Sequence, residues 1–261
     1  MQTQAELMDM LRQGTAHLVR MSEQLDFPWT PDVQDPMRLH NMYARSLVTC
    51  YVSKFAQLSE AILDSVEDQR FLVYALAGRS LIESTATLRY YLLEKYKPLL
   101  DKASLSNEDM KMLIEIDDQH LRGGRFDWES FFTQRYDALK AAASKALLDK
   151  KDKSQKAHVS SGLPHQTNVL TCIENWGKTS PEIMVIYNLF CDLVHPNMGS
   201  TFLVASMNND GLHFTQSRGS SMGAKIFEQS LPMLLSTTMK PFSDYLGMLM
   251  MTIYPDDQLK G

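Results

Sequence analysis

Two long stretches without an internal proline constrain the fold more than any other feature of this 261-residue sequence. Residues 36–68 and 69–98 carry apolar side chains at the three- and four-residue spacing of a helix. Asp35 precedes Pro36, which is typical of an N-cap followed by proline at the first helical position. Helices longer than 25 residues indicate a bundle of long antiparallel helices.

Other segments predict shorter helices and one hairpin. Start signals, end signals and spacing predict further helices over residues 3–25, from Ser106 to Gly123-Gly124, from Asp127, over 166–177, from Thr179 to His195, and over 221–253. Two β-prone runs flank Asn-Asn-Asp-Gly and predict a β-hairpin near 201–216. With only 12 Gly and 10 Pro, the chain lacks the turn residues of an all-β fold. We therefore predict a mainly α fold in a single helical domain, residues 1–261.

Charge and cysteine usage exclude some classes of protein. A net charge of -5 argues against a broad nucleic-acid surface, and we interpret the basic run Lys145–Lys156 as solvated, with a local RNA contact as the alternative. Three cysteines without paired spacing indicate reduced thiols and predict a cytoplasmic protein. The N-terminus does not resemble a signal peptide, and no apolar stretch reaches 18 residues, so no membrane partner is expected.

The segment YNLFCDLVHPNMGS, which begins at Tyr187, places polar groups on a mostly apolar helix. Asn188, Asp192 and His195 share one helical face, and Pro196 ends the helix. One interpretation is a polar site inside the bundle. The other is a structural turn in which His195 bonds a carbonyl and the next residues cap a new segment. The candidate residues here are Tyr187, Asn188, Asp192, His195 and Asn197.

A second candidate is the pair Arg79 and Glu83, four residues apart inside an apolar segment. A charge in such a place is costly unless it is paired. Arg79 could therefore bond Glu83, or it could reach Asp192 across the bundle.

These two segments carry a resemblance. The Arg-Ser-Leu-Ile-Glu run at 79–83 and the Leu-Val-His-Pro-Asn run at 193–197 resemble a group of uncharacterised bacterial all-helical proteins. That group is similar in overall character to the HEPN-like superfamily, over about residues 70–205. The resemblance implies a dimeric helical bundle with a role in bacterial stress or phage defence.

The chain departs from the HEPN nucleases at their catalytic signature, which is an Arg four to six residues before a His on one helix. No Arg precedes His195 at that spacing, and the single match, Arg12 before His17, is what chance placement gives. Two Asp-x-x-His pairs have the spacing of metal ligands, Asp117/His120 and Asp192/His195. Asp117 lies near the predicted end of its helix, where we expect it to be exposed. We predict no metal and no cofactor.

The function predicted from the sequence is that of an interaction or regulatory protein, with a second copy or another protein as partner. The alternative is an enzyme, either a divergent HEPN-like ribonuclease or a metal-dependent hydrolase, built on Arg79, Glu83, Asp192 and His195. A third possibility is a bundle that binds a small ligand in an enclosed pocket beside the same residues.

Overall fold

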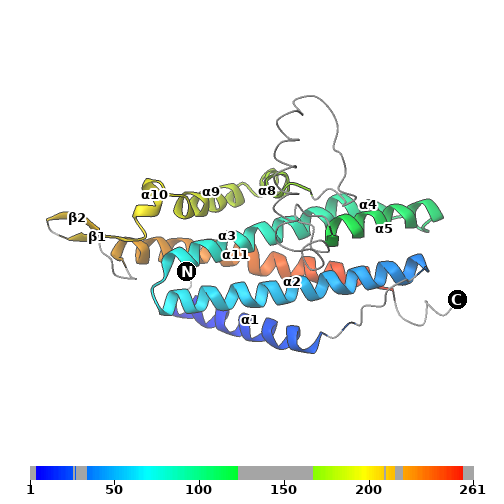
Figure 1. Cartoon of the computed structure of the whole chain (residues 1–261), viewed down its shortest axis with the longest axis horizontal. Coiled ribbons are helices and arrows are strands. Elements are labelled where there is room, and N and C mark those ends of the chain that lie inside the picture. The colour runs from blue at the N-terminus through cyan, green and yellow to red at the C-terminus, as the bar shows by residue number, and fades with distance from the viewer. Residues whose placement is uncertain are drawn as a thin grey trace, which may run out of the picture. The chain divides into compact units, whose positions relative to one another are not determined.

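The computed structural model describes residues 4–25, 27, 34–122, 167–208, 210–214 and 220–254. It is mainly α-helical, as predicted (Figure 1). The chain divides into two compact units, residues 1–117 with 168–261, and residues 118–167. The prediction of one domain remains a prediction, because most of the second unit is outside the described residues. The helix predicted from Asp127 and the run Lys145–Lys156 are also outside them.

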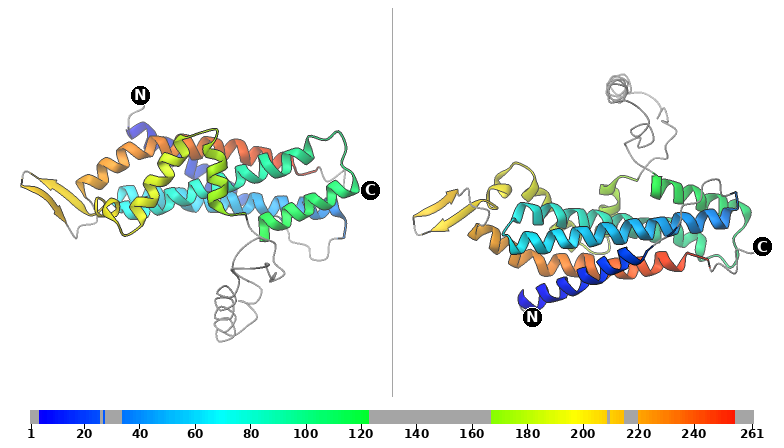
Figure 2. Two further views of the ribbon diagram at one scale, coloured as in Figure 1. Left: turned by 90° about the horizontal axis from the view of Figure 1, so that it is seen from above. Right: turned by 60° about the horizontal axis from the view of Figure 1, so that its bottom comes forward.

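The first unit begins with two antiparallel helices. α1 (Gln4–Gln24) packs along α2 (Pro36–Glu67), as Figure 2 shows. The side chain of Asp35 accepts a 2.7 Å hydrogen bond from the backbone N–H of Arg38, which confirms the predicted N-cap. After Asp68 the chain reverses within three residues, with Gln69 at a φ of 56°.

The next helix changes its winding halfway. α3 (Phe71–Tyr90) continues directly into the π-helix η1 (Tyr91–Tyr96) and the short α4 (Lys97–Leu100). The sequence predicts one regular α-helix over residues 69–98, and the π segment departs from that prediction. π segments are rare and often lie at functional sites.

The remaining elements largely follow the sequence signals. They are α5 (Asn107–Arg122), α8 (Val169–Gly177), α9 (Glu182–Val194), α10 (Met198–Thr201), β1 (Ala205–Asn208), β2 (Gly211–Phe214) and α11 (Ser221–Met251). Ser106 and Asp109 form a capping box at the start of α5, where the sequence predicts that a helix begins. Among the described helices, none is both long and apolar enough to cross a membrane.

The predicted hairpin near 201–216 is present. β1 and β2 pair antiparallel, with Ala205 opposite Phe214 and Asn208 opposite Gly211. Gly211 has a φ of +121°, a conformation that side chains with a Cβ rarely adopt, so glycine suits this turn.

α3 is the central element of the first unit, because it packs against α2, α8, α9 and α11. The buried ring of Tyr74 makes edge contacts with Phe190 and Phe227, and its hydroxyl lies 2.8 Å from Oγ of Ser230. Aromatic packing of this kind fixes the positions of α9 and α11 on α3.

Candidate functional site

Gly78 sets the close approach of α3 and α9. A Cβ at this position would lie 2.9 Å from Cζ of Phe190 and 3.2 Å from Cδ2 of Leu234. Phe190 is fully buried, so its ring has little room to move. The glycine therefore allows α9 to pack closely against α3, which places the next residue, Arg79, beside α9.

Arg79, Glu83 and Tyr187 form a small polar cluster between α3 and α9. Nε of Arg79 donates to Oε1 of Glu83 at 2.8 Å, and the hydroxyl of Tyr187 donates to the same oxygen at 3.3 Å. The guanidinium carbon of Arg79 lies 5.6 Å from the centre of the Tyr187 ring. The side chains of Arg79 and Glu83 keep 29% and 27% exposure, so solvent still reaches the ion pair.

The surroundings raise the pKa values of both Arg79 and Tyr187, so Arg79 stays charged and Tyr187 stays neutral. Burial, followed by the hydrogen bond with Cys191, raises the pKa of Tyr187 to about 12. Burial lowers the pKa of Arg79, but its bond with Glu83 and nearby negative groups together raise it. Arg79 is therefore a permanent cation, and Tyr187 is a neutral donor.

The other predicted site residues do not join this cluster. Asn188, Asp192, His195 and Asn197 are all exposed. The amide of Asn197 donates to Oδ1 of Asp192 at 3.4 Å, and among the described residues no bond joins Arg79 to Asp192 or His195. Of the two alternatives open in the sequence, Arg79 takes the bond to Glu83.

The His-Pro-Asn turn has the architecture of a helix junction. His195 is the C-cap of α9, and Asn197 and Ser200 form a reciprocal capping box at the start of α10. The capping role of Asn197 agrees with the structural-turn interpretation. The same interpretation expects His195 to bond a carbonyl. The backbone N–H of His195 does so, because it donates to the carbonyl of Cys191 at 3.1 Å.

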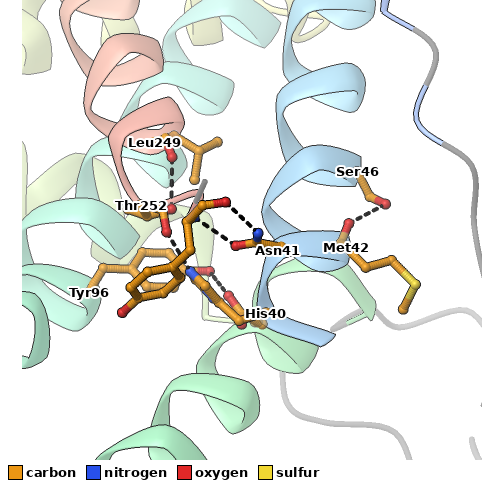
Figure 3. Close-up of polar contacts among 9 residues, drawn as sticks. His40, Asn41, Met42, Ser46, Tyr96, Leu249 and Thr252 are labelled. Atoms are coloured by element: carbon orange, nitrogen blue, oxygen red, sulfur yellow. Dashed lines mark hydrogen bonds and ion pairs between the residues drawn. The ribbon is translucent and has the colours of Figure 1, made fainter. Parts of the chain in front are cut away.

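The structure contains a second polar cluster, which the sequence does not predict. It is buried more deeply than the Arg79 cluster. His40 in the first turns of α2 and Asp117 in α5 are both fully buried, and Nδ1 of His40 lies 2.7 Å from Oδ2 of Asp117. The hydroxyl of Tyr96, the last residue of the π-helix, donates to Oδ1 of Asp117 at 2.8 Å. Figure 3 shows the imidazole of His40 beside the ring of Tyr96, directed toward Thr252 at the end of α11.

Hydrogen-bond chemistry fixes how many protons this network holds. Nε2 of His40 lies 3.0 Å from the carbonyl oxygen of Thr252, and a carbonyl can only accept, so Nε2 carries a hydrogen. One further proton is shared between Nδ1 of His40 and Asp117. The pair is therefore an imidazolium–carboxylate or an imidazole–carboxylic acid, and both forms have zero net charge.

Two neighbours complete the network. Burial first, and then the charge of Asp117, raise the pKa of Tyr96 well above its ordinary value, so Tyr96 remains a neutral donor. Asn41 donates to the carbonyl of Tyr254 at 2.8 Å and accepts from its N–H at 2.9 Å. The start of α2 is thus bonded to α5 and to the chain at the end of α11, and η1 joins the network through the bond from Tyr96 to Asp117.

This network corrects the expectation that Asp117 is exposed. The carboxylate of Asp117 can be buried because side chains from other helices bond it. One of them, His40, is 77 residues away in the chain. Burial lowers the pKa of His120, the other half of that Asp-x-x-His pair, to about 3. Within the part of the chain that the structure describes, no three His, Cys, Asp or Glu side chains gather as a metal site would require.

Comparison of the chain with protein-family models, with curated proteins and with solved structures found no match.

Proposed function

We propose that the chain is a cytoplasmic bacterial interaction or regulatory protein that acts through an exposed strip of α3, and that its first partner is a second copy of itself. The strip begins with three apolar side chains, Leu72, Val73 and Leu76, which are 49%, 37% and 49% exposed. Large aliphatic side chains at this exposure lose contact with water when a partner covers them. This apolar strip is the observation that carries the proposal.

The strip continues into the polar cluster. Leu72, Leu76, Arg79 and Glu83 follow one another at three- and four-residue intervals, which places them on the same helical face. Arg is enriched where proteins bind one another, and Arg79, whose side chain is 29% exposed, lies at the end of the apolar part. An exposed apolar patch with an adjoining Arg is a combination typical of protein interfaces.

The dimer belongs to this proposal, because an isologous interface needs only one surface that suits itself. The HEPN-like resemblance supports a dimeric bundle with a role in bacterial stress or phage defence. The free thiols of Cys50, Cys172 and Cys191 are in keeping with a cytoplasmic location.

Sedimentation equilibrium of the purified chain tests the proposal. We expect a dimer for the wild type, and at least a tenfold weaker association for the double variant Leu72→Asp, Leu76→Asp, because each carboxylate would be buried at the interface. Leu170→Asp is a matched control, since Leu170 is 48% exposed on a different helix, α8. A monomeric wild type, or equal weakening by Leu170→Asp, would count against the strip.

The alternative of a ribonuclease or hydrolase requires Arg79, Glu83, Asp192 and His195 to converge. Among the described residues the first two bond each other, whereas Asp192 accepts a hydrogen bond from the amide of Asn197. In the part of the chain that the structure describes, the four side chains therefore do not bond one another as a single site. Cleavage of RNA by the purified chain, abolished by His195→Ala, would overturn the proposal of a non-enzymatic protein.

A further inference from the structure

Arg89, in the last turn of α3, is a buried cation that forms no ion pair with the residues that the structure describes. It is only 7% exposed. Nη1 donates to Oδ1 of Asn175 at 2.7 Å, and Nη2 donates to Oγ1 of Thr179 at 3.4 Å. Both of these oxygens are neutral, and a buried charge is costly unless a group of opposite charge lies beside it.

The helix that carries Arg89 does not supply the missing negative charge. Backbone carbonyls offset a cation at the C-terminus of a helix, where they lack partners of their own. α3 continues without a break into η1 at Tyr91, so Arg89 does not lie at such an end. The described residues therefore leave its charge without compensation.

Hydrogen-bond acceptors around Arg89 are also too few. A guanidinium carries five N–H hydrogens. Besides Asn175 and Thr179, the hydroxyl of Tyr245 on α11 is the one further side-chain acceptor bonded to Arg89 in the described part of the chain. Three oxygens thus serve five hydrogens.

The partners of Arg89 have donors to spare. Since Oδ1 of Asn175 accepts from Arg89, both hydrogens on its Nδ2 remain, and no acceptor among the described residues bonds them. Burial raises the pKa of Tyr245, although the charge of Arg89 opposes this, so the hydroxyl is neutral and keeps its hydrogen. The cluster therefore has surplus donors and a surplus positive charge, and a group with lone pairs and a negative charge completes it.

The cluster is open to solvent on the side of α8. Asn175 and Tyr245 are half-buried, and Thr179 is exposed. Nδ2 of Asn175 is unpaired, yet it is not one of the unpaired atoms that the described structure seals from solvent, so a ligand can reach it. The ring of Trp176 meets that of Tyr245 edge-on, with the ring centroids 6.4 Å apart, and this contact holds the phenol beside α8.

We infer that Arg89, Asn175 and Tyr245 bind a carboxylate group, that of a free organic acid or of a peptide C-terminus. The carboxylate oxygens accept from the guanidinium, from Nδ2 of Asn175 and from the hydroxyl of Tyr245. One negative charge neutralises the single cation, whereas a phosphate would bring nearly two. A planar carboxylate also suits the planar guanidinium.

Titration with sodium acetate at about pH 7.5 and constant ionic strength, followed by the nuclear magnetic resonance signal of Nε–H of Arg89, tests the site. We expect a saturable shift with a Kd of about 1–10 mM. Acetamide has the shape of acetate without its charge, and inorganic phosphate has a larger charge. Each should bind about tenfold more weakly than acetate.

N-acetylglycine distinguishes the two sources of the carboxylate, because it carries the carboxylate of a peptide C-terminus. Tighter binding than that of acetate identifies a peptide ligand, and weaker binding identifies a free organic acid.

Asn175→Asp supplies the missing charge from the chain itself, since the oxygen at this position lies 2.7 Å from Nη1 of Arg89. Without acetate, this variant should melt about 2–4 °C above the wild type, and it should no longer bind acetate. Tyr245→Phe removes one donor and should weaken acetate binding by about tenfold. Tyr254→Phe is the matched control, because Tyr254 packs beside His40 instead, and its acetate binding should equal that of the wild type.

Four results would each overturn the inference. They are absence of a saturable shift with acetate, binding of acetamide or phosphate as tight as that of acetate, a melting temperature of Asn175→Asp below that of the wild type, and insensitivity of acetate binding to Tyr245→Phe.

Discussion

His40 and Asp117 are separated by 77 residues in the chain, yet Nδ1 of one lies 2.7 Å from Oδ2 of the other, and neither side chain is exposed. The pair has zero net charge, and removal of either member would leave the other as a buried polar or charged group without its partner. The contact therefore links the start of α2 to α5 in a way that tolerates few substitutions.

Substitutions at Asp117 should separate the need for a partner from the need for a charge. Asp117→Ala leaves His40 and Tyr96 without their shared acceptor and should cost about 3–5 kcal/mol. Asp117→Asn should cost only about 1 kcal/mol, because its amide can donate to Nδ1 of a neutral His40 while its oxygen accepts from Tyr96. Urea unfolding followed by circular dichroism measures both values. Equal losses for the two variants would contradict the proton arrangement described above.

Any side chain added at position 78 should destabilise the fold, because no space is left for it. Gly78→Val would force a Cβ to 2.9 Å from Cζ of the buried Phe190, and we expect a loss of about 1–3 kcal/mol in the free energy of unfolding. Gly14 in α1 is the matched control, since a Cβ there meets nothing within 4 Å. Gly14→Ala should therefore stabilise the chain by about 0.5–1 kcal/mol through helix propensity. Thermal unfolding of both variants gives the comparison, and a neutral Gly78→Val would show that α9 can shift.

Tyr187 should make the chain less stable at alkaline pH. Burial and the bond with Cys191 raise its pKa from an ordinary value of 10.0 to about 12 in the folded state. Its contribution to stability is therefore fully present below pH 10 and is lost as the pH rises through about 12. Tyr187→Phe should lose less stability than the wild type between these two pH values, as measured by urea unfolding at each pH. Parallel curves for the two proteins would show that the phenol titrates normally.

Arg79 and Glu83 should contribute little to stability by themselves. Both side chains are more than a quarter exposed, and solvent screens an ion pair of this kind. A double-mutant cycle with Arg79→Met and Glu83→Gln should give a coupling energy below about 1 kcal/mol. A coupling energy above about 2 kcal/mol would mean that the Arg79–Glu83 pair stabilises the fold itself and is not a surface available to a partner.

The sequence predicts local features well and distant contacts poorly. Asp35-Pro36 marks the start of α2, and Asn-Asn-Asp-Gly marks the hairpin, because each signal acts through neighbouring residues. The pair Arg79 and Glu83 is visible for the same reason, since four residues make one helical turn.

Contacts between helices have no such local signal. Nothing near His40 in the sequence indicates Asp117 as its partner, because the isolated polar residues of α2 resemble those of a solvated face. Spacing alone groups Asp192 with His195, whereas the packing leaves both side chains exposed. The π-helix has no sequence signal either, because Tyr91–Tyr96 has the composition of an ordinary helix.

The π segment restricts how the length of this chain can vary. A regular helix turns by about 100° per residue, so a further insertion within residues 91–96 would rotate the downstream helix around its axis. One added residue before Tyr96 would swing its hydroxyl away from Asp117 and leave that acceptor short of a donor. Natural length variants of such a protein should therefore carry their insertions at the surface turns and none between Tyr91 and Tyr96.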